Sequence, residues 1–176
     1  MTVTPRVEER ELAAIVKVAM ESMVVMGYTT QRHLLVDLDN VGLDEAMFIA
    51  REIRRTWPMV GGALVVESSP HHYHLVYDNY IDWATIEDII EALADIGVVE
   101  RNYAWIRTFR RDLTLRVSDK KGADYYRPAP TPVAEVETGG FRAGVPDYLH
   151  LVVAYRALQE AYKRYWGDYM YDSSTA

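Results

Sequence analysis

The stretch RHLLVDLDNVG, residues 32–42, ends an apolar run with two aspartates one residue apart. Successive side chains of a β-strand point to opposite faces, so Asp37 and Asp39 share the face opposite to Val36. Two carboxylates side by side repel each other unless a proton or a cation lies between them. The stretch therefore predicts either a strand that ends in solvent, followed by a turn and a helix cap, or a strand that presents a cation site.

The segments around this strand predict an α+β fold. Apolar periodicity predicts helices over 7–27, 43–57, 82–97 and 146–168, strands over 33–39, 62–69, 71–77, 103–109 and 112–118, and a loop rich in Pro, Gly and Thr over 122–145. For residues 33–121 this order predicts an RRM-like or ferredoxin-like split βαβ sheet with helices on one face, extended by an N-terminal and a C-terminal helix. The 176 residues are expected to form a single domain.

The composition is that of a folded globular chain. Hydrophobic residues make up 49% of the sequence, and the absence of cysteine excludes both a disulfide framework and a thiolate metal site. The first residues, MTVTPRVEERE, do not resemble a signal peptide, and no apolar run reaches the ~18 residues of a membrane span. We therefore expect a soluble, cytoplasmic protein with no membrane partner. Few Asn and Gln beside many Glu and Arg favour a thermophilic source.

The charge is unevenly distributed along the chain. The net charge is −7, which argues against indiscriminate binding of nucleic acid. Residues 101–121 nevertheless hold only two acidic residues against seven basic ones, which are Arg101, Arg107, Arg110, Arg111, Arg116, Lys120 and Lys121. A local basic stretch in an acidic chain is typical of a site that handles phosphates, and equally of a solvated edge strand.

The expected sheet topology brings polar residues of distant segments to one face. In such a sheet the first and third strands are neighbours. The third strand carries His72 and His74 on one face, so two imidazoles are expected to meet the two carboxylates. The last strand adds Arg116 and Ser118, with Lys120 just beyond. Carboxylates for a hard divalent cation beside imidazole, guanidinium and ammonium groups predict a triphosphate site, although a single strand histidine or arginine is more often structural.

Three short motifs resemble those of the archaeo-eukaryotic primase superfamily, the primase-polymerases, over roughly residues 33–121. The strand LLVDLD resembles the first motif of that family, a hydrophobic strand that ends in Asp-x-Asp. ESSPHHYH, residues 67–74, resembles its second motif, a small-x-His strand after a Ser-Pro turn. LTLRVSDK, residues 113–120, resembles a basic strand of some members. The resemblance implies an RRM-like catalytic core and a nucleotidyltransferase of the DNA primase or polymerase type.

The resemblance also implies roles for individual residues. Asp37 and Asp39 would bind Mg²⁺ or Mn²⁺ during nucleotidyl transfer to a primer 3′ hydroxyl, and Asp112 is the nearby candidate for a third metal ligand. The candidate catalytic residues are Asp37, Asp39 and His74. The candidate nucleotide-binding residues are Ser69, His72, His74, Arg116, Ser118 and Lys120, and the candidate nucleic-acid contacts are Arg107, Arg110, Arg111 and Lys121. The implied partners are nucleoside triphosphates, a DNA or RNA template and a larger replication subunit.

Two departures from the family pattern keep a second function open. His72 stands where the second motif has a small residue, and the third motif, a hydrophobic residue followed by Asp, has no clear match. Asp112 is expected in a turn, and the other possible third carboxylates are Asp78, Glu67 and Asp119. Without a third carboxylate a second metal is weakly held. The alternative is a degenerate member that binds nucleotide or single-stranded nucleic acid without polymerising.

Two further alternatives concern the third strand. His72-Tyr73-His74 also resembles the His-hydrophobic-His strand of rolling-circle endonucleases, in which a tyrosine attacks the scissile phosphate. The helix at 82–97 has no tyrosine, so the candidate nucleophiles are Tyr155, Tyr162 and Tyr165 of the last helix. The other alternative is a non-catalytic adaptor that binds a protein or single-stranded nucleic acid. Such modules stack bases on aromatic residues of the sheet, but Tyr73 and Tyr77 are expected to pack under the helices.

Overall fold

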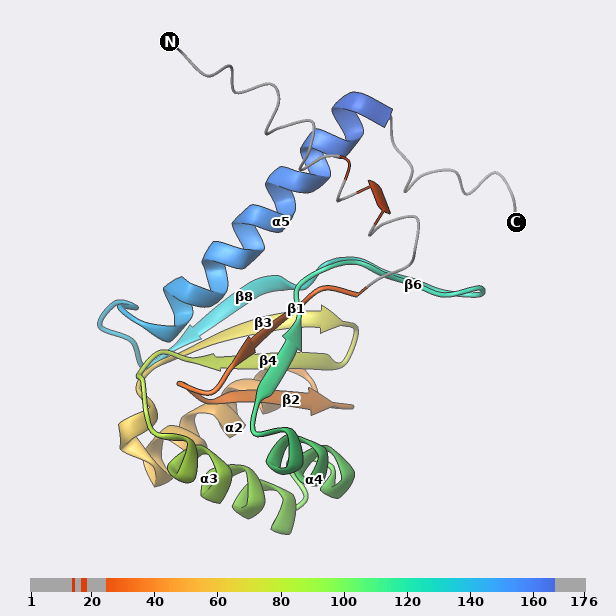
Figure 1. The fold of residues 1–176 in the computed structure, drawn as a ribbon. Helices are drawn as coiled ribbons and strands as arrows, with labels where there is room; N and C mark the ends of the chain where they lie inside the picture. The colour runs from red at the N-terminus through yellow and green to blue at the C-terminus, as the bar shows by residue number, and fades with distance from the viewer. Residues whose placement is uncertain (1–13, 15–16, 19–24, 167–176) are drawn as a thin grey trace.

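The fold is α+β and contains the expected split βαβ arrangement (Figure 1). The computed structural model describes residues 14, 17–18 and 25–166. The strands are β1 (Gly27–Thr30), β2 (Leu35–Asp39), β3 (Ala63–Ser69), β4 (His72–Tyr77), β5 (Leu113–Arg116), β6 (Lys120–Lys121), β7 (Tyr126–Arg127) and β8 (Thr131–Val136). The helices are α2 (Leu43–Thr56), the short 3-10 helix η1 (Pro58–Val60), α3 (Trp83–Asp95), α4 (Arg101–Arg110) and α5 (Gly144–Trp166).

The main sheet is antiparallel, with the strand order β2-β4-β3-β8. β2 and β4 are neighbours, which confirms the prediction for the first and third strands. β2 is buried along most of its length, and Leu35, Val36 and Leu38 are at most 1% exposed. The apolar run that the sequence ends with two aspartates is therefore part of the hydrophobic core.

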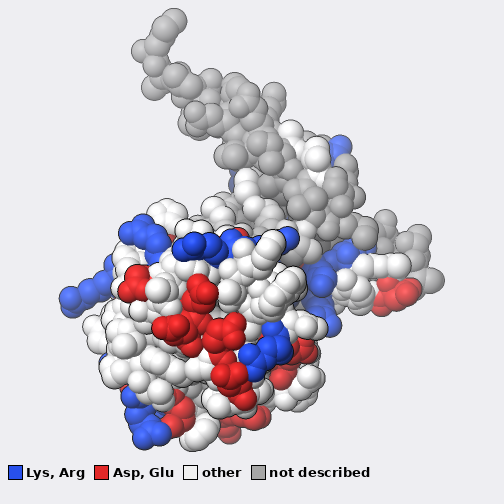
Figure 2. Space-filling view, turned by 60° about the horizontal axis from the view of Figure 1, so that its bottom comes forward, with Lys and Arg blue, Asp and Glu red and all other residues white. Residues whose placement is uncertain are grey.

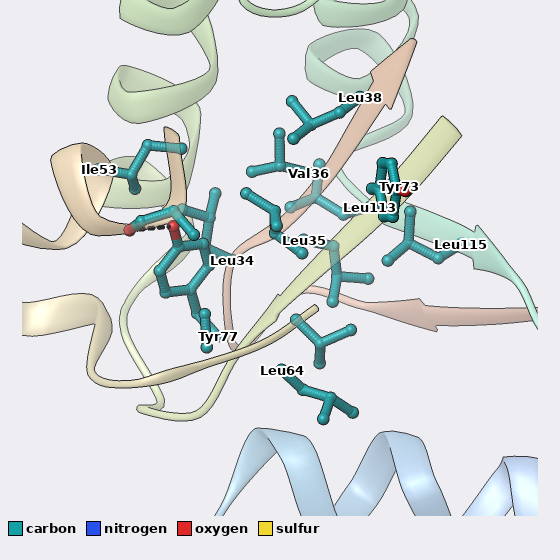
Figure 3. Packing of buried hydrophobic residues seen from close by; sticks show 14 of the residues in the cluster. Leu34, Leu35, Val36, Leu38, Ile53, Leu64, Tyr73, Tyr77, Leu113 and Leu115 are labelled. Atoms are coloured by element: carbon teal, nitrogen blue, oxygen red, sulfur yellow. Dashed lines mark hydrogen bonds between the residues drawn. The ribbon is translucent and has the colours of Figure 1, made fainter. Parts of the chain in front are cut away.

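Helices lie on both sides of this sheet: α2, α3 and α4 on one side and α5 on the other (Figure 1). Figure 3 shows Tyr77 of β4 beside Ile53 of α2, and Leu64 of β3 toward α5. The Tyr77 hydroxyl donates to the backbone carbonyl of Ala50 in α2 at 2.9 Å, so this buried polar atom is satisfied. Tyr73 is also buried, which agrees with the expectation that neither tyrosine offers its ring to a base on the open sheet.

β5 pairs with β1 and does not extend the main sheet by hydrogen bonds. It still contacts β2, and Gly27 of β1 lies directly opposite Arg116. The sequence predicts Gly27 as the last residue of an N-terminal helix, and this prediction is wrong because Gly27 begins a strand. Most of the rest of the predicted helix at 7–27 lies outside the described residues.

The segment 103–109, for which the sequence predicts a strand, belongs to helix α4. Its Tyr, Trp, Ile, Thr and Phe residues favour strands by propensity, and the prediction rests on that preference. Tyr103, Ala104 and Arg107 nevertheless turn inward at the three- and four-residue spacing of one helix face. Arg111, with a left-handed φ of 57°, ends the helix.

The predicted loop over 122–145 is wrong in its central part, which contains two strands. β7 pairs with β6 in a small hairpin, and β8 is an edge strand beside β3. Pro132 lies inside β8, where the register with β3 shifts. A proline is tolerated in an edge strand at such an irregularity. Because proline is rare in strands, alternation alone does not predict this one.

The predicted C-terminal helix is confirmed as α5, which begins at Gly144. Within the described part of the chain, no helix combines the length and the hydropathy that crossing a membrane requires. Asp78, only 5% exposed, fixes the start of α5: its carboxylate accepts hydrogen bonds from the backbone N–H groups of Arg142, Ala143 and Val145 at 2.7–3.1 Å. Val145 lies in the first turn of α5, so its bond satisfies a donor that a helix leaves unpaired, and the other two bonds hold the segment just before the helix.

Replacing Asp78 by alanine should therefore lower the free energy of unfolding by about 2–3 kcal/mol, because three N–H groups lose a charged acceptor. Urea denaturation measures this change. The exposed Asp88→Ala in α3 is the matched control and should change stability by at most about 0.5 kcal/mol. Equal effects of the two substitutions would contradict the capping role of Asp78.

Candidate functional site

The end of β2 and the start of β4 bring four ionisable side chains to one face of the main sheet. Residues directly opposite each other in an antiparallel pair share a face. Asp37 lies opposite His74. Asp39 lies opposite His72. The predicted meeting of two carboxylates and two imidazoles is therefore confirmed by the strand register.

The outer pair, Asp39 and His72, is in direct contact. The distance between Asp39 Oδ1 and His72 Nδ1 is 2.5 Å, and the two side chains are 49% and 27% exposed. Solvent screens a pair this exposed, so it contributes little to stability. It does orient Asp39, whose second carboxylate oxygen accepts no hydrogen bond from a described residue and is open to a ligand.

The inner pair, Asp37 and His74, is not an ion pair. His74 Nε2 lies 3.6 Å from Asp37 Oδ1, which is too far for a hydrogen bond. Burial of His74, followed by the positive charge of Arg116, lowers the pKa of its imidazole to about 3, so the ring is neutral at neutral pH. Its Nδ1 is buried and has no hydrogen-bond partner among the described residues. A bound ligand could satisfy this atom.

The Asp37 carboxyl resists ionisation. Its partial burial, followed by the negative charge of Asp39, raises its pKa to about 6, and the positive charges of His72, Arg107 and Arg116 offset this only in part. At higher pH two like charges therefore lie side by side on one strand. A cation bound between them would relieve this repulsion.

A pocket of about 220 Å³ opens in front of these side chains, with an acidic and a basic wall. The acidic wall is formed by Asp37 and Asp39, and the basic wall by Arg116, Lys120 and Arg127. Among the described residues, no carboxylate forms an ion pair with any of the three cations. The pocket thus places positive charge that is not held in an ion pair of the described residues opposite a pair of carboxylates.

Arg116 is held in this wall by backbone carbonyls. Its guanidinium donates to the carbonyls of Ser118 at 2.5 Å, Pro128 at 2.9 Å and Ser68 at 2.5 Å. Burial, followed by the nearby charge of Arg127, lowers the pKa of Arg116, but a guanidinium stays charged in a protein. Three separate segments therefore fix the position of the cation without neutralising it.

A second hollow, of about 340 Å³, adjoins Asp37 and Asp39 next to the connection between α3 and α4. Glu100 and Arg101, at the start of α4, are part of its lining. Glu100 is thus a carboxylate that shares a hollow with the two aspartates, and the sequence does not single it out. A correct assignment of the helix start at Arg101 would have been the signal.

The carboxylates that the sequence offers as a third metal ligand lie elsewhere. Asp112 pairs with Arg107 at 3.4 Å, and Asp78 caps α5. Asp119 accepts hydrogen bonds from the N–H of Ala129 and from the side chain of Gln159. Each of these carboxylates is engaged in holding the fold together.

Glu67 lies opposite Tyr73, on the sheet face away from the two histidines. Within residues 25–166, and in the few described residues before them, no group of three or more His, Asp or Glu side chains is arranged to hold a metal ion. Asp37 and Asp39 alone are oxygen donors that repel each other, and such a donor pair fits one hard divalent cation.

Two serines predicted to bind nucleotide do not line the pocket, whereas Ser68 does. Ser69 is buried opposite His72, beyond a register shift in β3. The Ser118 hydroxyl accepts from the N–H of Met26 and donates to the carbonyl of Asp119. Ser68 lies two residues after Val66, which is opposite His74, so alternation along β3 places Ser68 on the histidine face.

The basic residues predicted to contact nucleic acid are divided between the surface and the interior. Arg110, Arg111 and Lys121 are exposed, but the Arg107 side chain is only 18% exposed and pairs with Asp112. In the hairpin, Lys120 lies opposite Arg127. Lys121 therefore points away from the pocket that Lys120 lines. The sequence does not single out Arg127, because it predicts a loop where β7 forms.

Comparison with models of known protein families gives no match, and the comparisons with curated proteins and with solved structures find no similar chain.

Asp37→Asn should stabilise the metal-free protein at mildly alkaline pH by about 1 kcal/mol, a value discounted for the solvent screening of a side chain that is 39% exposed. The raised pKa of Asp37 means that the folded state binds its proton more tightly than the unfolded chain does. Ionised Asp37 therefore lowers the free energy of unfolding by its full amount above pH 6. This destabilisation vanishes below pH 3.8, the ordinary pKa of an aspartate.

Thermal unfolding in EDTA across this pH range measures the effect. Asp124→Asn, an exposed loop position, is the matched control and should behave like the wild-type protein at every pH. A gain for Asp37→Asn that does not change with pH would contradict the raised pKa as its cause.

Proposed function

We propose that the protein is a nucleotidyltransferase of the DNA primase or polymerase type, which acts on a nucleic-acid template with a divalent metal ion. The observation that carries this proposal is the pocket with Asp37 and Asp39 on one wall and Arg116, Lys120 and Arg127 on the other. A nucleoside triphosphate with its metal ion needs both kinds of charge within one small space. The motifs that resemble the primase-polymerases supply most of these residues.

The two aspartates would hold Mg²⁺ or Mn²⁺, and the basic wall would bind the triphosphate. A bound divalent ion would neutralise developing charge on the phosphates and lower the pKa of an attacking hydroxyl. Arg116, already fixed by three carbonyls, would bind phosphate oxygens without first being ordered. The neutral His74 can donate one hydrogen bond to a phosphate oxygen without adding charge.

The pocket volume suits the phosphates and not a whole nucleotide. Pockets that enclose drug-sized ligands measure ~300–1,000 Å³, and this one measures about 220 Å³. The sugar and base would therefore extend beyond it. The second hollow, which also borders Asp37 and Asp39, is the adjoining space on the side of α4.

A second candidate function is nucleotide binding without transfer. The specific observation in its favour is that Asp112 is engaged by Arg107 and that the described residues contain no group of three metal ligands. A single cation beside a triphosphate supports binding, whereas in-line transfer commonly uses two.

The positions of the tyrosines give little support to the endonuclease alternative, which needs a tyrosine nucleophile near the histidines. Of the described residues, no tyrosine lines the pocket with His72 and His74. Tyr155 is buried and its hydroxyl accepts from the N–H of Asp119, and Tyr162 is buried as well. The side chain of Tyr165 lies outside the described residues.

Lys120→Ala and Arg127→Ala should each weaken the binding of deoxyadenosine triphosphate with Mg²⁺ by about tenfold, because each removes a charge-assisted hydrogen bond to phosphate. Calorimetry measures the affinity. Lys121→Ala is the matched control on the same hairpin, since its side chain points to the other face. An equal loss in all three variants would mean that the hairpin acts only through its net charge.

Nucleotide incorporation on primed and unprimed single-stranded templates, with Mg²⁺ or Mn²⁺, should be detectable and should disappear in the double variant Asp37→Asn, Asp39→Asn. The products are separated beside a lane that reveals a covalent protein–DNA adduct. Triphosphate binding without incorporation would favour the degenerate binder. An adduct without incorporation would favour the endonuclease instead.

A further inference from the structure

Helix α4 exposes two stacked aromatic rings. Trp105 and Phe109 are 66% and 78% exposed, although both are large apolar side chains that a helix normally turns toward the core. Their ring centroids are 5.8 Å apart and their planes differ by only 15°. The rings therefore stack on each other in solvent, one helical turn apart, instead of packing under the chain.

The residues around this pair are basic. Arg110 and Arg111 follow at the end of α4, and neither forms an ion pair with a described residue. Arg101, one turn before Trp105, pairs with Glu91 and Asp95 of α3. An aromatic surface with free guanidinium groups beside it suits a ligand that combines flat rings with negative charge.

The charge of the neighbouring surface restricts where such a ligand can lie. Figure 2 looks at the side of α2, α3 and α4: acidic side chains gather in the middle of this view and basic ones lie toward its margins. A polyanion is therefore repelled from the centre of this face and attracted to its edge. An apolar partner protein would find a better surface between α2 and α3, where Phe48, Trp57 and Ile96 line a hollow of about 410 Å³.

The aromatic pair also lies on a path to the two aspartates. Arg101, Trp105 and Phe109 are spaced four residues apart and form one stripe along α4. With a rise of 1.5 Å per residue, this stripe is ~12 Å long. Its first member, Arg101, lines the same hollow as Asp37 and Asp39, and α4 lies beside the end of β2 (Figure 1). A strand that follows the stripe therefore arrives at the carboxylates.

We infer that the exposed face of α4, with Trp105 and Phe109 as stacking residues and Arg110 and Arg111 as phosphate contacts, binds single-stranded nucleic acid and leads it to the site at Asp37 and Asp39. This inference rests on the proposed function, in which the strand is the template. Each outer ring face can receive a base and continue the existing stack. Because stacking is possible with every base, the surface binds without sequence preference.

Fluorescence anisotropy of a short fluorescein-labelled oligothymidylate, in EDTA and without nucleotide, tests this surface alone. Trp105→Ala and Phe109→Ala should each weaken binding by between about fivefold and about 100-fold, the loss expected for one stacked base. Trp105→Phe should keep most of the affinity, because it keeps a stacking ring. Phe48→Ala is the matched control: it removes an aromatic side chain that is 60% exposed on α2, and affinity should not change.

Intrinsic tryptophan fluorescence provides a second readout. The oligonucleotide should quench the emission of the wild-type protein, and Trp105→Phe should abolish most of this quenching while binding persists. That combination places the base on residue 105. The truncated side chains are largely exposed, so circular dichroism and the thermal midpoint should be unchanged, which excludes unfolding as the cause of weaker binding.

Wild-type affinity in both alanine variants would overturn the inference. So would failure of the wild-type protein to bind the oligonucleotide, even if triphosphate binding still responds to Lys120→Ala, because the pocket would then act without this platform. If Trp105→Ala changes the sedimentation of the unliganded chain but not its affinity for the oligonucleotide, α4 is a self-association surface and the inference is wrong.

Discussion

The antiparallel pairing of β2 with β4 is the constraint on which the site depends. It places Asp37 opposite His74 and Asp39 opposite His72, and it buries Val36 and Leu38 on the other face. A slip of one residue would turn both carboxylates into the core and both apolar side chains toward solvent. The hydrophobic alternation that folds the strand therefore also fixes the chemistry. No separate device is needed to hold the four ionisable groups together.

The electrostatic interactions within this group of side chains are unfavourable. The pKa of Asp37 is raised, in part by the like charge of Asp39 beside it. Its neighbour His74 is a neutral ring, and one buried ring nitrogen has no hydrogen-bond partner among the described residues. Nothing in the packing of β2 requires two carboxylates on this face, and the neutral His74 does not compensate them. Perturbed groups gathered at one pocket are typical of a functional site. The three carbonyls around Arg116 support the same interpretation, since they order a cation that forms no ion pair with a carboxylate of the described residues.

Patterns of short range predict most of the main sheet and the three helices α2, α3 and α5. β2, β3 and β4 follow from alternation, the helices follow from helical spacing, and the expected topology makes β2 and β4 neighbours. Arg127 could not be found in this way, because its strand exists only through pairing with β6. The pairing of Asp112 with Arg107 could not be found in this way either, because Arg107 lies on an inward helix face, which a strand assignment of that segment cannot reveal.

The sequence predicts a strand where α4 forms, and the physical reason is the composition of this segment. Its Trp, Ile, Thr and Phe residues prefer strands, and a helix that carries them has lower intrinsic stability than one built from strong helix formers. In the helix, Tyr103 and Arg107 point toward the interior, and Trp105 and Phe109 are exposed to solvent. Propensity disfavours these rings in a helix, and hydration disfavours them at a surface. Under the inference drawn above, these exposed rings would stack on the bases of a nucleic-acid ligand, and Arg110 and Arg111 at the end of α4 would contact its phosphates.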